Sequence, residues 1–292
     1  MKNPGLAVFL ALIIIPVTGD LFAKEIISWP RRDFPPLYIV TGEDRGRGIT
    51  DEAVSAVQER LIEYDHADLE ETNDQRVFFE LKSGNKLCSG GMIWTKNRAS
   101  EVYYSIPYNT VPPLRIYFLK GKLPLFKDQI RNGGISLREI LRNRKLNLEI
   151  EAGRSYGDEL DEVIRENEQN GMVVRRFASN TEGVIQMMLH GRNIDLIIEY
   201  PWVMNYYLKD RPELDSFLSV RILESGRFQE ERFIAPRTEW GKSFIRRIDE
   251  IIREKSVTDR CRKAVSRWLD EESRIQFESE FNEMVKRRDS GS

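Results

Sequence analysis

The chain has 292 residues, which is enough for one large domain or for two lobes of ordinary size. Its 45 Lys and Arg residues nearly balance 47 Asp and Glu residues, and a net charge of −2 gives no reason to expect a nucleic-acid partner. The hydrophobic content of 40% supports a substantial core. Neither His66 nor His190 has a Cys or His neighbour at ligand spacing, so we expect no metal site and no cofactor.

The first residues have the layout of a secretory signal peptide. Lys2 supplies a positive charge, Leu6–Val17 is an apolar run, and a polar stretch of small residues follows. The run is shorter than the roughly 20 apolar residues that a membrane-spanning helix needs. We therefore expect residues 1–23 to be a signal peptide, cleaved after Gly19 or Ala23, and the mature protein to be exported to the periplasm. An uncleaved anchor helix is the alternative.

The two cysteines, Cys88 and Cys261, lie far apart in the sequence. In an oxidising compartment they could form one disulfide, or both could remain free thiols. The sequence leaves these two states open.

Strands and helices alternate in the first part of the mature chain. Thr50 is a suitable N-cap, because Asp51 and Glu52 follow in the first turn, where acidic side chains suit the helix dipole. The expected strands here are Glu25–Trp29, His66–Thr72 and Arg115–Leu119. The expected helices are one that starts at Thr50 and one at Asn73–Leu81.

The same alternation restarts near Lys120 and turns back near Ile222. The expected strands are Leu146–Ile150, Val173–Ala178, Ile194–Glu199 and Phe228–Pro236. The expected helices are Ser136–Leu141, Asp158–Glu168, Asn180–Met188, Glu239–Lys255 and Asp259–Glu271. Such β-α-β alternation predicts mainly parallel sheets with helices on both faces. We therefore expect an α/β protein in which residues 24–119 and 226–292 form lobe one and residues 120–225 form lobe two.

The segment Leu87–Tyr108, LCSGGMIWTKNRASEVYYSIPY, is the most informative part of the chain. Its glycine pair lets another group approach the backbone, and Thr95 and Arg98 follow at a spacing of three residues. The segment resembles "GxxxTxxR…FSxPY" of the amino-acid-type (family 3) periplasmic solute-binding proteins. The resemblance implies the type 2 periplasmic binding protein fold, with two α/β lobes joined by two crossing strands.

The resemblance also implies where a ligand binds. Arg98 matches the arginine that grips the ligand carboxylate, and Phe34 matches an aromatic residue that stacks on the ligand. The turn Gly153–Ser155 matches an anion-holding turn at a helix start, and Glu199 or Tyr200 falls where an acidic residue meets the ligand's amino group. The candidate ligand-binding residues are Phe34, Trp94, Thr95, Arg98, Ser155, Tyr156, Glu199 and Tyr200. No catalytic residue is expected.

Simpler roles remain open for several of these residues. Arg98 could close a surface ion pair with Glu101, Ser155 could be only a helix cap, and Trp94 or Tyr156 could be packing aromatics. The turn before Arg98 also departs from the family, because Gly91 and Ile93 stand where hydroxyl residues are usual. The chain therefore resembles a divergent branch of the family whose ligands are poorly defined.

We expect a periplasmic solute-binding protein that captures a small carboxylate-bearing ligand, an amino acid or a related compound, for transport or signalling. Its partners would be this small molecule and, outside this chain, an ABC transporter permease or a membrane sensor. We expect a monomer and no enzymatic activity. Two alternatives are a dehydratase-like enzyme on the same scaffold, with Glu199 as its acid/base, and a sensor or interaction protein that binds no ligand.

Overall fold

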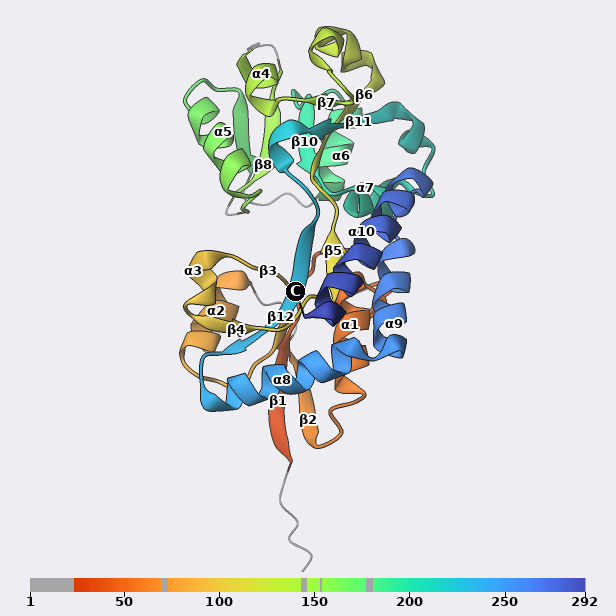
Figure 1. The fold of residues 1–292 in the computed structure, drawn as a ribbon. Helices are drawn as coiled ribbons and strands as arrows, with labels where there is room; N and C mark the ends of the chain where they lie inside the picture. The colour runs from red at the N-terminus through yellow and green to blue at the C-terminus, as the bar shows by residue number, and fades with distance from the viewer. Residues whose placement is uncertain (1–23, 70–72, 143–145, 153, 177–180, 292) are drawn as a thin grey trace, which may run out of the picture.

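The computed structural model describes residues 24–69, 73–142, 146–152, 154–176 and 181–291. The expected signal peptide, residues 1–23, lies outside the described residues. Two α/β lobes are joined at a narrow waist (Figure 1). Among the described residues, no helix combines the length and the apolar character that a membrane span requires.

Lobe one is built on strands from both ends of the mature chain. The strands are β1 (Glu25–Pro30), β2 (Tyr64–Leu69), β3 (Ser89–Ile93), β4 (Val102–Tyr104), β5 (Asn109–Val111) and β12 (Gln229–Pro236). β1 and β2 pair in parallel, whereas β12 runs antiparallel to β3, β4 and β5. Backbone hydrogen bonds from Ser28 to Lys86 and from Cys88 to Ser28 attach the β1–β2 pair to the segment that leads into β3.

The helices of lobe one cover both faces of these strands. They are α1 (Ile49–Gln58), α2 (Asp74–Lys82), α3 (Lys96–Ala99), α8 (Glu239–Arg253), α9 (Lys255–Ser266) and α10 (Glu271–Ser290). α1 begins at Ile49, two residues before the start that an N-cap at Thr50 predicts, so Thr50 lies inside the helix and Gly48 is the N-cap. The carboxylate of Asp51 accepts the backbone N–H groups of Gly48 and Ile39, which fixes the entry to the helix.

Lobe two contains a six-stranded sheet with the order β7-β11-β6-β10-β8-β9. The strands are β6 (Arg115–Leu119), β7 (Gly134–Ile135), β8 (Leu148–Glu151), β9 (Val173–Arg176), β10 (Leu196–Glu199) and β11 (Phe217–Ile222). The helices are α4 (Leu137–Arg142), α5 (Asp158–Glu168), α6 (Thr181–Leu189) and α7 (Pro201–Leu208). Short 3-10 segments lie at Lys120–Leu125, Lys127–Gln129, Pro212–Ser216 and Leu223–Ser225.

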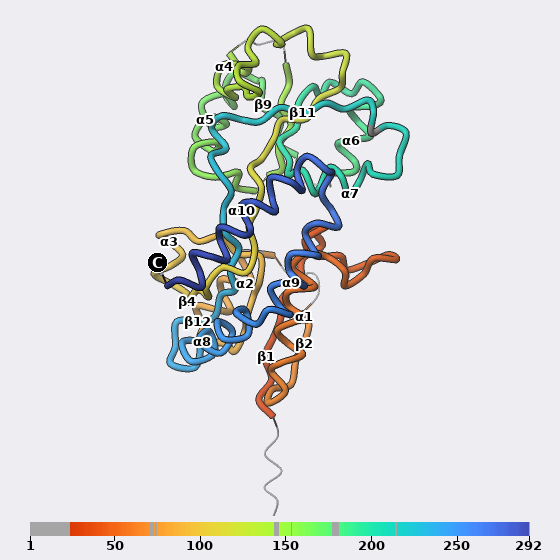
Figure 2. The backbone as a smooth tube through the Cα atoms, turned by 45° about the vertical axis from the view of Figure 1, so that its right-hand side comes forward, coloured from red at the N-terminus to blue at the C-terminus, as the bar shows by residue number. Residues whose placement is uncertain are grey.

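The chain crosses the waist twice, between β5 and β6 and between β11 and β12 (Figure 2). β6 pairs with β10 and β11, so Arg115–Leu119 belongs to the six-stranded sheet although we expected it in lobe one. The strand lies there because both of its edges are hydrogen-bonded within that sheet. The lobe boundaries as a whole remain a prediction.

A second contact between the lobes comes from α7 and α10, two helices that we did not expect. The expected helix Asp259–Glu271 is instead split, because α9 ends at Ser266 and Asp270 caps α10 by accepting the N–H of Ser273. Trp202 of α7 lies in one buried cluster with Trp268 and with Phe277 of α10. An apolar cluster therefore joins lobe two to the C-terminal helices (Figure 1).

Both cysteines lie in the core of lobe one as free, buried thiols. Burial raises the pKa of Cys88 and raises that of Cys261 to about 12. The bridge that the sequence leaves open is not formed in this structure, and neither thiol is ionised at neutral pH.

Trp268 provides a test of the apolar contact between the lobes. It is fully buried, its ring makes an edge contact with that of Tyr206 at 5.3 Å between the ring centres, and its carbonyl accepts the side-chain amide of Asn205 at 3.1 Å. We expect Trp268→Ala to lower the free energy of unfolding by about 3–5 kcal/mol, because it leaves a large cavity. Urea denaturation measures the change. Ile275→Ala on α10, where the side chain is 67% exposed, is the control and should change stability by less than about 0.5 kcal/mol.

Candidate functional site

The residues that meet between the lobes are centred on Arg154. Its Nη1 and Nη2 atoms donate to the two carboxylate oxygens of Glu199 at 2.6 and 2.7 Å, which is a bidentate ion pair. Glu199 is 3% exposed, and it also accepts the hydroxyl of Thr181 at 3.3 Å and the backbone N–H of Tyr200 at 2.8 Å. The carboxylate is therefore hydrogen-bonded on both oxygens.

Sheet topology explains why these residues meet. β8 and β10 are adjacent parallel strands, so their carboxyl ends reach the same edge of the sheet. Glu199 is the last residue of β10, and Arg154 follows the end of β8 by three residues. Tyr200 is the N-cap residue of α7, and Pro201 starts that helix, a favourable position because proline has no N–H to satisfy.

Three aromatic rings surround the guanidinium of Arg154. Its central carbon lies 4.8 Å from the ring centre of Tyr156, 5.6 Å from that of Tyr200 and 5.4 Å from that of Phe34. All three distances are within the range of a cation–π contact. Phe34 comes from the loop after β1 in lobe one, whereas the two tyrosines come from lobe two. We call Phe34, Tyr156, Glu199 and Tyr200 the cation box.

The surroundings of Arg154 are acidic. Glu149, Glu151 and Glu199 line, with Arg154 and Thr181, a pocket of about 20 Å³, which has room for one water molecule. Burial raises the pKa of Glu151, Arg154 lowers it and Glu199 raises it again. Burial alone would lower the pKa of Arg154, but the charge of Glu199 and the hydrogen bonds to it outweigh that effect and raise it. Arg154 therefore stays charged.

Burial also raises the pKa values of Tyr156 and Tyr200 to about 12 in each case. Both phenols are protonated at neutral pH, so the box presents neutral ring faces and one carboxylate. A larger groove of about 520 Å³ begins at Arg154, Ser155 and Tyr156 and continues along α5.

The structure places the candidate residues of lobe one apart from the cation box, with the exception of Phe34. Trp94 is 52% exposed, and Thr95 caps α3 by accepting the N–H of Arg98 at 3.3 Å. The guanidinium of Arg98 lies 4.9 Å above the ring of Phe78. Glu101 does not form the ion pair with Arg98 that we considered, because it pairs with Lys82 at 2.8 Å.

In lobe two, Ser155 has a local role at the start of α5. Its hydroxyl donates to Asp161 at 2.6 Å and accepts the N–H of Gly157 at 3.3 Å. Gly153, the first residue of the expected anion-holding turn, lies outside the described residues. A ligand-binding role for Ser155 remains a prediction, as it does for Arg98, Trp94 and Thr95.

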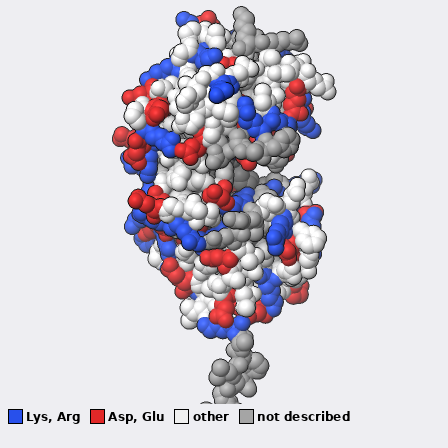
Figure 3. Space-filling model, turned by 180° about the vertical axis from the view of Figure 1, so that it is seen from behind, with Lys and Arg blue, Asp and Glu red and all other residues white. Residues whose placement is uncertain are grey.

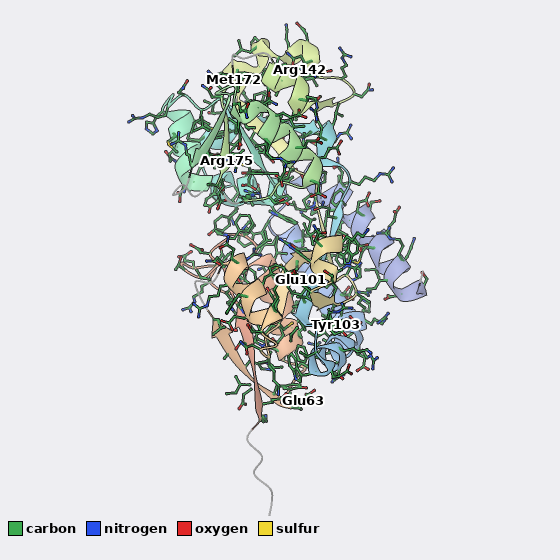
Figure 4. The ribbon with its side chains drawn as sticks, turned by 90° about the vertical axis from the view of Figure 1, so that its left-hand side faces the viewer. Glu63, Glu101, Tyr103, Arg142, Met172 and Arg175 are labelled. Atoms are coloured by element: carbon green, nitrogen blue, oxygen red, sulfur yellow. The ribbon has the colours of Figure 1, made fainter. Side chains whose placement is uncertain are left out.

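The two lobes approach each other at the waist (Figures 3 and 4). Acidic and basic side chains are intermixed over the face that Figure 3 shows. Figure 4 labels Glu101 in lobe one and Arg175 in lobe two, on opposite sides of the waist. Among the described residues, no group of side chains has the composition and spacing of a metal site.

The sequence alone did not identify the residues beneath the glycine turn of lobe one. The hydroxyl of Tyr108 accepts the N–H of Gly91 at 2.8 Å. Gly91 has a φ of +72°, and a Cβ there would lie 3.2 Å from the hydroxyl of Thr50, so both conformation and space favour glycine. Thr50 is fully buried, and its hydroxyl has no hydrogen-bond partner among the described residues.

Glu231 on β12 lies in the same buried region. It accepts the side-chain amide of Asn109 at 2.9 Å. Burial raises the pKa of Glu231 to about 7, although Asn109, Arg32 and Tyr108 each lower it. The only signal in the sequence is that Glu230 and Glu231 are neighbours, so one of them must point to the inner face of the strand.

Structures similar to this chain share its two-lobed architecture. A probable amino-acid ABC transporter extracellular-binding protein of Bacillus subtilis, ytmK, has a TM-score of 0.62 at 17% identity, over 85% of this chain and 99% of that chain. A histidine kinase sensor domain with similarity to periplasmic binding proteins has a TM-score of 0.59 at 17% identity, over 84% of this chain and 96% of that chain.

A third similar structure is an ancestral amino-acid-binding protein, described as a precursor of cyclohexadienyl dehydratase. Its TM-score is 0.61 at 16% identity, over 84% of this chain and 96% of that chain. The chain has the type 2 periplasmic binding protein fold. This confirms the expected fold class, and identities this low show the fold alone. No protein-family model and no curated protein matches the sequence.

The raised pKa of Glu231 predicts an unusual dependence of the free energy of unfolding on pH. Because its pKa is higher in the folded protein, about 7, than the ordinary 4.5, the folded state holds a proton that the unfolded state has lost between these values. Raising the pH through this window should therefore lower the free energy of unfolding, by up to about 3 kcal/mol.

Urea denaturation of wild type and Glu231→Gln at pH 4.5 and pH 8 measures this effect. The glutamine can still accept the hydrogen bond from Asn109 but does not ionise, so the loss should disappear in the variant. Glu230→Gln, on the neighbouring residue, should keep the wild-type loss. If Glu231→Gln loses as much stability as wild type, the pKa of Glu231 is not raised in the folded protein.

Proposed function

We propose that this chain is an exported solute-binding protein that captures a small carboxylate-bearing ligand, an amino acid or a related compound, between its two lobes. The observation that carries the proposal is the convergence of Phe34 from lobe one with Arg154, Tyr156 and Tyr200 from lobe two. Aromatic faces and a charged group that meet between two lobes suit a small polar ligand with an apolar body.

In this proposal, residues 1–23 export the chain to the periplasm and are removed. Two of the structurally similar proteins, an extracellular-binding protein and a sensor domain, support an extracytoplasmic role either in transport or in signalling. The partner would accordingly be an ABC transporter permease or a membrane sensor, and the protein would work as a monomer.

Lobe one would supply the carboxylate clamp. Arg98 lies in α3, three residues after the N-cap Thr95. α3 lies at the edge of lobe one that faces lobe two (Figures 1 and 2). Its planar guanidinium can form two parallel charge-assisted hydrogen bonds with a carboxylate. Among the described residues, the ring of Phe78 lies against the face of the guanidinium, and no side-chain hydrogen bond occupies its edge. Trp94, which lies four residues before Arg98 and is exposed, would cover the ligand.

Contacts in lobe two argue against an enzyme on the same scaffold. Glu199 would be its acid/base, but both carboxylate oxygens are bound to Arg154. A general base must lie within hydrogen-bond reach of the substrate proton, and here the guanidinium of Arg154 occupies both oxygens. We therefore propose a binding function without catalysis.

A second candidate is a sensor or interaction protein that captures no solute. The specific observation in its favour is that Arg154 already fills the space between Phe34 and Tyr200. In that case the two-lobed shape itself, and not a captured molecule, would be what a partner recognises.

Native mass spectrometry of the protein purified from its own periplasm tests the proposal. A small molecule that leaves the protein on activation supports solute capture. If no solute co-purifies, and titration with the proteinogenic amino acids and cystine releases no heat, solute capture is refuted and the second candidate stands.

Arg98→Ala tests the clamp once a solute is identified. We expect affinity to fall at least about tenfold, because an anion loses its buried, hydrogen-bonded partner. Isothermal titration compares the variant with wild type. Lys96→Ala removes an exposed cation from the same helix and should leave affinity within about twofold of wild type. Equal affinities of Arg98→Ala and wild type would assign Arg98 to packing on Phe78 alone.

A further inference from the structure

The contacts of Arg154 form a complete recognition set for a guanidinium group. Glu199 binds its edge in a bidentate pair, while Tyr156, Tyr200 and Phe34 contact it with their rings. A carboxylate fork at the edge and aromatic rings around the cation are the two ways in which proteins recognise guanidinium ions. Other arginines of the described residues have simpler surroundings. Arg237, for example, lies 5.0 Å above Tyr103 and donates to the carbonyl of Ala99.

We infer that the cation box is a binding site for a guanidinium-type cation, which the chain fills with its own Arg154. The site takes a group that carries a delocalised positive charge and N–H donors in a plane. Arg154 thus acts as a tethered ligand that is already in place.

The carboxylates around the cation box favour a bound cation. Glu149 is 6% exposed and Glu199 3% exposed, and both line the same pocket as Glu151. Arg176 lies 3.9 Å from Glu149, and Arg154 binds Glu199 directly. If Arg154 were shortened, Glu199 would remain as a buried carboxylate without its bidentate partner, which is a costly state. A small cation from solution would relieve that cost.

The filled box also decides which solutes the cleft can take. This specificity rests on the proposed function, because it assumes that the cleft captures a solute. Arg154 occupies the position in which a solute would place a cationic end against Glu199. The wild-type protein would therefore select solutes that have an anionic or neutral end there, and it would discriminate against arginine-like cations.

Removal of Arg154 should open the box to a cation from solution. The probe is methylguanidinium, which matches the end of the arginine side chain, and the control compound is methylurea, which has a similar shape but no charge. We expect about 10 mM methylguanidinium to raise the Tm of Arg154→Ala by about 2 °C or more, since a ligand that binds only the folded state stabilises it. Methylurea should have no such effect.

Three matched proteins complete the experiment. Wild type should show no methylguanidinium-specific rise, because Arg154 fills the box. Arg237→Ala, which removes an arginine stacked on a single ring, should also show none. Arg154→Ala with Glu199→Gln should lose the rise, because the neutral amide no longer offers a carboxylate fork. Isothermal titration should show binding to Arg154→Ala at least about tenfold tighter than to the double variant.

A variant that does not stay folded is tested by refolding. If Arg154→Ala unfolds, its refolding yield after dilution from urea should rise with methylguanidinium and not with methylurea. Equal effects of the two compounds, or an equal rise in Arg237→Ala, would overturn the inference. The outcome is separate from solute capture: rescue of Arg154→Ala, together with a wild type that binds no solute, would support the cation box and refute the proposed function.

Discussion

The ion pair between Arg154 and Glu199 determines the chemistry at the waist of this protein. Both charged groups are largely removed from water, at 14% and 4% side-chain exposure, and such a pair is tolerated only if its hydrogen bonds are nearly complete. Thr181 and the backbone of Tyr200 supply the remaining bonds to Glu199. The pair exists because two adjacent parallel strands end at the same edge of the sheet in lobe two.

Two kinds of contact hold the lobes together, and they differ in strength. On the side of α7 and α10, Trp202 and Trp268 are buried in one apolar cluster, and a buried aromatic residue of 150–250 Å² contributes roughly 4–6 kcal/mol at 25 cal/mol per Å². The cation box adjoins this cluster, because Phe34 and Tyr200 pack against it. The contact that the box itself adds between the lobes is that of Arg154 with Phe34, for which about 0.5–2 kcal/mol is typical. Apart from the two chain crossings, the contact between the lobes therefore lies mainly at α7 and α10, and the cation–π contact of Arg154 adds less.

The alternation of strands and helices could be predicted from the sequence, because the period of the apolar residues and the length of each segment distinguish a strand from a helix. Arg115–Leu119 and Asp158–Glu168 have the expected bounds, and the fold class is confirmed. α10 was missed because its apolar residues are few. Phe277, Phe281 and Met284 form a narrow stripe in a highly charged helix, and such a stripe has meaning only once the partner surface on α7 is known.

The candidate site was only partly predictable for a related reason. Phe34, Tyr156, Glu199 and Tyr200 were named from resemblance, and the structure brings them together. Arg154, which lies among them, is not distinguished by the sequence, because it is one residue of the turn between β8 and α5. Nothing in its local sequence distinguishes a side chain that turns into the box from one that points to solvent. That distinction is made by three rings and a carboxylate from distant parts of the chain.

Because Arg154 fills the cation box, the charges that line it do not by themselves predict the charge of a ligand. Three glutamates line the pocket beside Arg154, so the field of lobe two attracts cations, while Arg98 in lobe one attracts anions. A zwitterion would satisfy both lobes if the box were empty. Because Arg154 occupies the box and neutralises Glu199, attraction toward a cation remains but the space for it does not. In the solute-binding function that we propose, selectivity would thus depend on whether Arg154 occupies the box, a property that neither net charge nor the residue types of the pocket would reveal.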